Sequence, residues 1–136
     1  MVAVIPEKPA QAAPAAHDRQ VRVTYRENGS EYWFTTGPAG APTGYARVVQ
    51  HHRHTWIDEI AVHPDARGRG LATLLLTAVI GRFGHRTIGL HCAPFTPQRW
   101  GPRPPGLERD RLLRWYGSHG FEVDAFDECM WRPGDR

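Results

Sequence analysis

The feature that most constrains this chain is a change of hydrophobic period on either side of a glycine-rich turn. Residues Trp56 to Val62 predict a β-strand, and the turn Arg67-Gly68-Arg69-Gly70 follows shortly after. Beyond the turn, leucines and other apolar residues recur at helical spacing, which predicts an amphipathic helix from Gly70 to about Phe83. The short apolar run Thr87 to Cys92 then predicts a buried strand. A strand, a helix and a second strand in this order predict a crossover that makes the two strands parallel.

The segments on either side complete an α+β chain. Three strands are expected before this unit, and a second helix and two closing strands after it. These elements begin near Val21, Tyr32 and Gly44 for the early strands, near Leu107 for the helix, and at Phe121 and Glu128 for the closing strands. Asn28-Gly29 joins the first two strands as a two-residue hairpin signal. We therefore expect a mixed, mostly antiparallel sheet of about six to seven strands with two main helices.

Length and composition predict one domain with a short tail. The 136 residues suit a single domain, and the Ala- and Pro-rich residues 1–18 are expected to be a flexible tail before a domain at residues 19–136. No stretch approaches the ~18 apolar residues of a membrane helix. The net charge of +3 suits an anionic ligand but is too small and too scattered to indicate nucleic acid. Cys92 and Cys129 form no CxxC pair, and with no signal segment a cytoplasmic protein is expected.

The glycine-rich turn is suited to a phosphate group. A helix start leaves backbone N–H groups unpaired, and the helix dipole favours an anion there. Gly68 and Gly70 let a ligand approach the backbone closely, and Arg67 and Arg69 add positive charge. A pyrophosphate is therefore expected here, although glycines at a strand-to-helix turn also occur for steric reasons alone. The candidate cofactor-binding residues of this turn are Arg67, Gly68, Arg69, Gly70, Leu71 and Ala72.

Two motifs carry a resemblance to a known family. The spacing Arg-Gly-x-Gly-x-Ala, preceded by Val62-His63-Pro64, resembles the acyl-CoA loop of the GNAT superfamily of N-acetyltransferases. Tyr116, four residues before Gly120-Phe121, resembles the helix-end signature of the same family. The resemblance covers roughly residues 43–132. It implies a GNAT-like fold and acetyl-CoA as co-substrate, with an acetyl group transferred to a primary amine of a small molecule or a protein. The alternative is a CoA-binding regulatory module without catalysis.

The resemblance also implies roles for individual residues. In this family the fourth and fifth strands splay apart, and the pantetheine arm of the cofactor lies between them. Backbone groups of Ile60, Ala61 and Val62 are then expected to hold that arm, and the Val62 N–H to polarise the thioester carbonyl. Tyr116 is expected to protonate the leaving sulfur or to donate a hydrogen bond to it.

The general base is expected among two adjacent carboxylates. Strand alternation predicts Asp58 on the face of Trp56, Ile60 and Val62, with Glu59 on the other face. One member of the family carries its catalytic His at the position matching Asp58, which favours Asp58 over Glu59. The alternative without a catalytic role is an acidic pair that lies in solvent or binds a nearby Arg. His91 as the base and Cys92 as a nucleophile are two further alternatives at the end of the fifth strand.

One departure from the family concerns the acceptor. Most relatives place two helices between their first two strands, where this chain has Asn28-Gly29. The acceptor site is therefore expected to be open, or completed by the loop Pro94–Gly106 or by a second copy in a homodimer. No metal site is expected, because His51, His52 and His54 are spaced too closely for one site on a regular strand and have no acidic or Cys partner nearby.

Overall fold

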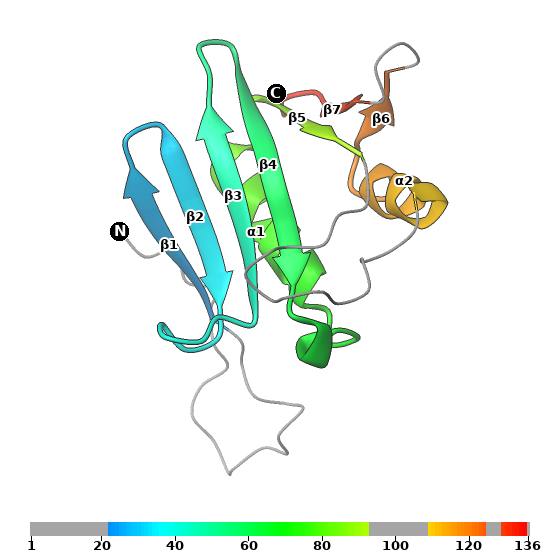
Figure 1. Cartoon of the computed structure of the whole chain (residues 1–136). Helices are drawn as coiled ribbons and strands as arrows, with labels where there is room; N and C mark the ends of the chain where they lie inside the picture. Colours follow the sequence, from blue (N-terminus) through cyan, green and yellow to red (C-terminus); the bar gives the residue numbers. More distant parts are fainter. Residues whose placement is uncertain (1–21, 93–108, 125–128, 136) are drawn as a thin grey trace.

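The computed structural model describes residues 22–92, 109–124 and 129–135. This part of the chain forms a seven-stranded sheet in the order β1-β2-β3-β4-β5-β7-β6, with two α-helices (Figure 1). The strands are β1 Val23–Asn28, β2 Glu31–Thr36, β3 Gly44–Gln50, β4 His54–Val62, β5 Thr87–His91, β6 Glu122–Val123 and β7 Cys129–Arg132. The helices are α1 Leu71–Phe83 and α2 Arg109–Gly117, with the short 3-10 turn η2 Pro64–Ala66 before α1. The predicted α+β class is confirmed.

Strand directions also follow the prediction. The pair β4–β5 is parallel, as expected for strands joined through α1, and the other neighbours are antiparallel. Strands β1 and β2 form a hairpin in which Asn28 pairs with Glu31, so the turn residues are Gly29 and Ser30. The turn lies one residue later than Asn28-Gly29, and Gly29 takes the positive φ of 66° that such a turn needs. No helix separates these two strands.

The core lies between α1 and one face of strands β1 to β4. Helix α1 buries Leu75, Leu76, Val79 and Phe83, and the strands bury Val23, Phe34, Ala46, Val48 and Ile57 against it. Cross-strand partners share a face of a sheet, so the register assigns the remaining residues to faces. The face turned away from α1, which we call the distal face, carries Glu31, Trp33, Tyr45, Arg47, Trp56 and Glu59.

Some predictions fall outside the described residues. The tail at residues 1–18, the loop Pro94–Gly106 and the expected helix start at Leu107 are among them. Within residues 22–92, 109–124 and 129–135, neither helix has the length and apolar character needed to cross a bilayer.

Candidate functional site

A β-bulge in β4 changes which face its residues occupy. Arg47 of β3 pairs with Glu59, whereas the next residue, Val48, pairs with Ile57, so Asp58 is the extra residue of the bulge. Ile57 and Ile60 consequently both face α1, through their partners Val48 and Ala46.

The alternation predicted for β4 is therefore wrong. Trp56 lies on the distal face, whereas Ile60 and Val62 lie on the α1 face. Asp58 and Glu59 bond to the distal-face residues Arg47 and Tyr45 respectively. The bulge brings the two carboxylates to one face because a regular strand would bury one of them beneath α1.

Beyond the bulge, β4 and β5 separate. Their parallel pairing ends at Ile57 and Leu90, while β4 continues to Val62 (Figure 1). No strand of the described part of the chain pairs with the last residues of β4 on the β5 side. The splay expected from the family resemblance is present in this geometry.

The end of β4 presents backbone groups toward this separation. The N–H of His63 donates to the Thr43 carbonyl at 2.7 Å, so in an antiparallel pair the backbone groups of Ala61 also face β3. Those of Ile60 and Val62 face the other way, and we call these two residues the open edge of β4. Of the three predicted backbone ligands, Ala61 is thus turned away from the separation, and Ile60 and Val62 face it.

The glycine-rich turn has the shape of an anion site. Gly70 is the N-cap of α1 in the left-handed region, with φ 76° and ψ 14°, and no side chain of the described residues caps the helix. The first bond inside the helix is donated by Leu74 to the Gly70 carbonyl, at 3.1 Å. The N–H groups of the first turn, from Leu71 to Thr73, therefore have no acceptor inside the helix. Successive N–H groups at a helix start attract an anion.

The space in front of this turn is not filled by the described residues. A Cβ atom at Gly68 or Gly70 would have no heavy atom within 4 Å, and Gly68 also has a positive φ, of 82°. Arg67 and Arg69 are exposed, and the Arg67 Nε donates to the Val62 carbonyl at 3.4 Å. Arg67 therefore connects the turn to the open edge of β4.

Tyr116 lies at the end of α2, on the β5 side of the separation. It is only 5% exposed, and its ring makes an edge contact with Phe121 at 5.6 Å between centroids. Burial, and then the neighbouring Cys92 thiol beyond the end of β5, raise the pKa of Tyr116 above its usual value. The phenol consequently keeps its proton at neutral pH and can donate a hydrogen bond. The indole of the preceding residue, Trp115, donates to the Thr73 hydroxyl at 3.3 Å. This bond joins α2 to the first turn of α1.

The two candidate bases have different partners. Asp58 is ion-paired with Arg47, which also binds Glu31 at 2.6 Å between Nη2 and Oε2. Glu59 accepts a hydrogen bond of 3.0 Å from the hydroxyl of Tyr45, a neutral group that is itself 3% exposed. Among the described residues, the bonded partner of Glu59 is thus an uncharged hydroxyl, whereas that of Asp58 is a guanidinium. The alternative of an acidic residue bound to a nearby Arg therefore describes Asp58.

Sequence reasoning missed Arg47 and Tyr45. The adjacent carboxylates Asp58 and Glu59 between two isoleucines could have indicated the bulge. In a regular strand neighbouring side chains point to opposite faces, so one carboxylate would face the core, whereas a bulge lets both face solvent. No local signal marks Arg47, because its partners come from β2 and β4 and are set by the register.

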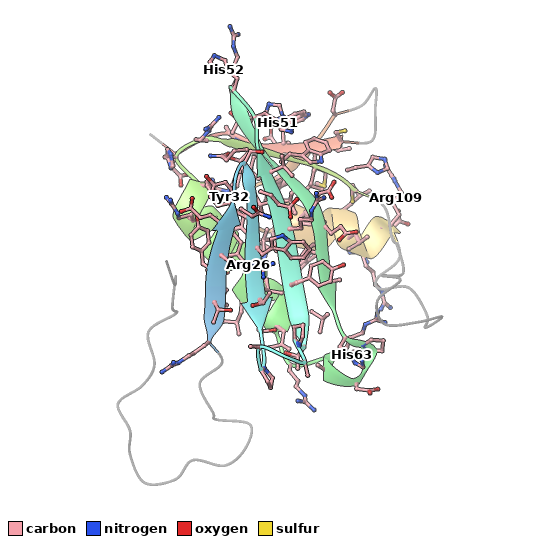
Figure 2. All side chains as sticks on the ribbon, turned by 60° about the vertical axis from the view of Figure 1, so that its left-hand side comes forward. Arg26, Tyr32, His51, His52, His63 and Arg109 are labelled. Atoms are coloured by element: carbon pink, nitrogen blue, oxygen red, sulfur yellow. The ribbon has the colours of Figure 1, made fainter. Side chains whose placement is uncertain are left out.

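The other site alternatives are placed as follows. Cys92 is 1% exposed, and His91 is exposed at the end of β5. His51 and His52 lie at the end of the sheet opposite His63, which precedes the glycine-rich turn (Figure 2). Among the residues the structure describes, no three His, Cys, Asp or Glu side chains are grouped as a metal site requires.

Comparison with known protein families shows which family the chain is related to. The sequence pattern described as the acetyltransferase (GNAT) family matches residues 4–99, which include the bulge, the open edge and the glycine-rich turn. The chain belongs to the GNAT acetyltransferase family. The match ends before Tyr116, so the GNAT assignment rests on the cofactor half of the site. No curated protein matches the chain in sequence.

Solved structures agree with the GNAT fold. The ribosomal-protein-S18-alanine N-acetyltransferase of Escherichia coli superimposes with a TM-score of 0.58 and 17% identity, over 81% of this chain and 73% of that one. A GNAT-family acetyltransferase of Bacteroides thetaiotaomicron gives 0.55 and 15%, over 79% of this chain and 64% of that one. The PaiA N-acetyltransferase of Thermoplasma acidophilum, solved with coenzyme A, gives 0.54 and 12%, over 76% and 61%. This chain thus spans less than two thirds of the last two structures.

Proposed function

We propose that this chain transfers an acetyl group from acetyl-CoA to a primary amine of a small molecule or a protein. The observation that carries the proposal is the separation of β4 from β5 directly beside an uncapped, glycine-lined helix start. A pyrophosphate needs N–H donors and an open approach, and the turn at Gly68 to Ala72 has both. An extended amide-bearing arm needs a strand edge, which Ile60 and Val62 offer.

The residues divide the chemistry between them. Acetyl-CoA, when bound, supplies the acetyl group as a thioester. The Val62 N–H donates to the thioester carbonyl oxygen, where negative charge develops. Glu59 accepts a proton from the bound ammonium, directly or through water, and the neutral amine then attacks the thioester carbonyl. The C–N bond forms, the C–S bond breaks, and the second proton of the nitrogen leaves with the thiolate to give the free thiol. Holding amine and thioester side by side supplies much of the rate.

Tyr116 stabilises the departing sulfur. A thiol has a pKa of about 8.5, below that of a phenol. Because burial raises the pKa of Tyr116 further, complete proton transfer from its hydroxyl to the thiolate is unfavourable. A hydrogen bond from the neutral hydroxyl is the role that fits. Of the two roles expected for Tyr116, protonating the sulfur and donating a hydrogen bond to it, we propose the second.

The proposal is tested with Tyr116→Phe and with Tyr32→Phe as a matched control. Tyr32 loses the same hydroxyl but packs on Tyr25 and Phe83, on the α1 face of the sheet. Thiol release is measured over a panel of amines, and CoA affinity by calorimetry. We expect Tyr116→Phe to bind CoA normally and to lose about 100-fold in kcat, with Tyr32→Phe near wild type. Wild-type protein that binds CoA and releases no thiol with any amine is instead a non-catalytic CoA-binding module.

A further inference from the structure

We propose that Arg47 is a positioning residue that fixes the bulge of β4 by holding Glu31 and Asp58, and that Asp58 acts through Arg47 rather than as a proton acceptor. The catalytic half of this inference rests on the proposed function; the structural half does not.

The contacts of Arg47 span three strands. Its Nη2 bonds to Glu31 of β2 at 2.6 Å, and its Nη1 bonds to Asp58 at the bulge of β4. The indole of Trp33, two residues further along β2, donates to the other oxygen of Glu31. Both oxygens of Glu31 and one oxygen of Asp58 therefore accept hydrogen bonds. A planar guanidinium with several N–H groups can bind two carboxylates at once.

The position of Arg47 in the register places it at the bulge itself. The pairing of β3 with β4 shifts between Arg47 and Val48, and the extra residue is the one that Arg47 binds. If β4 continued from Trp56 without the bulge, Glu59 would turn toward α1 and Ile60 would turn outward. The ion pair and the burial of Ile60 therefore favour the same irregular strand.

Charge on the distal face leads to the same role. Glu31 of β2 and the carboxylates Asp58 and Glu59 of β4 carry like charges on either side of β3, and Arg47 of β3 pairs with the first two. The hydrogen bond from Arg47, followed by that from Trp33, lowers the pKa of Glu31. The bond to Glu31 is also the main cause that raises the pKa of Arg47. Glu59 keeps the uncharged Tyr45 hydroxyl as its partner, at 3.0 Å.

Two consequences follow for the site. The bulge precedes the open edge, so a loosened bulge lets Ile60 and Val62 leave the orientation that a pantetheine arm needs. It also lets Glu59 leave the distal face. Asp58 contributes to both effects through its bond to Arg47. Replacing Asp58 should therefore change the bulge and CoA binding only in a chain that still has Arg47.

The experiment is a double-mutant cycle of Arg47→Met and Asp58→Asn. Arg53→Met is the matched control, because Arg53 carries the same charge at the exposed tip between β3 and β4. Amide hydrogen exchange across residues 57–62 reports the bulge without any ligand. Calorimetry with CoA reports the open edge, and kcat/KM against pH reports the base. Arg47→Lys, which keeps the charge, is the second variant should Arg47→Met fail to fold.

We expect Arg47→Met to speed exchange in β4 and to weaken CoA binding roughly three- to tenfold, with Arg53→Met unchanged. Arg47→Lys falls between Arg47→Met and wild type. Asp58→Asn has a smaller effect of the same kind, which disappears in the Arg47→Met background. The acidic limb of the pH profile persists in Asp58→Asn.

Two results overturn the inference. One is unchanged exchange in β4 on removal of the guanidinium. The other is an Asp58→Asn variant that binds CoA normally but loses kcat and the acidic limb, equally with and without Arg47. If no amine is acetylated, the exchange cycle still decides the structural claim, and the proposed function fails separately.

Discussion

Gly70 offers a test of the cofactor turn in which shape and charge are separated. Its φ of 76° lies in the left-handed region, where Asn and Asp are the side chains best tolerated after Gly. Its Cβ position is open, so the Cβ of either residue would meet no heavy atom within 4 Å. Gly70→Asn and Gly70→Asp therefore have nearly the same size and backbone cost, and differ by one negative charge.

The expected difference follows from Coulomb's law. A carboxylate at Gly70 would lie roughly 5 Å from a pyrophosphate on the first N–H groups of α1. At that distance each like-charge pair costs about 0.8 kcal/mol in water and about 3 kcal/mol at an effective dielectric of 20. Because Gly70 is exposed, the lower value applies. Two phosphate charges then cost about 1.7 kcal/mol, which is about fifteenfold in Kd.

Calorimetry with CoA measures this difference. Gly70→Asp should bind about fifteenfold more weakly than Gly70→Asn, and 0.5 M salt should shrink the gap because it screens exposed charges. Each variant should lose about 1 kcal/mol of stability from the left-handed backbone, so their Tm values should agree with each other. Equal affinity of the two variants for CoA, at low salt, would refute the placement of the pyrophosphate.

Three other predictions test the packing of the fold. Burial, and then His51 and Arg86, lower the pKa of His54, so the unfolded chain binds its proton more readily and the free energy of unfolding falls as the pH drops below about 6.5. His54→Gln should flatten that part of a Tm-against-pH profile; an unchanged slope would contradict the assignment. A Cβ at Gly89 would lie 2.4 Å from the Trp131 ring, so Gly89→Ala should cost about 1–3 kcal/mol in urea unfolding, and wild-type stability would mean the ring moves freely. Trp115→Phe loses the donor to the Thr73 hydroxyl and should cost about 0.5 kcal/mol, with faster amide exchange in the first turn of α1; unchanged exchange there would show that α2 does not brace the turn.

The element types and their order along the chain were within reach of the sequence because they depend on local patterns. The hairpin followed from Asn28-Gly29, and α1 followed from apolar residues at helical spacing up to about Phe83, where the helix ends in the structure. The parallel pairing of β4 and β5 followed from the helix between them. These features need only neighbours in the chain and the general rules of connection.

The site was only half predictable. The glycine-rich turn and Tyr116 are motifs read along the chain, and the structure has them at the start of α1 and near the end of α2. Their roles toward the cofactor stay predictions. The faces of β4 were predicted wrongly because strand alternation ignores bulges, and the bulge depends on packing of Ile60 under α1. Arg47 was missed because its importance comes from two strands that the register brings to it. The hydrophobic pattern along one strand does not predict contacts that depend on the pairing of other strands.

The most direct test of the account is an amide NMR titration with CoA. The largest shifts should fall on the N–H groups of Ile60, Val62, Gly68, Gly70 and the first turn of α1, with Ala61 and the His51–His52 tip little affected. Shifts concentrated at the tip or on β1 and β2, with the glycine-rich turn silent, would contradict the claim that CoA binds between β4, β5 and the start of α1.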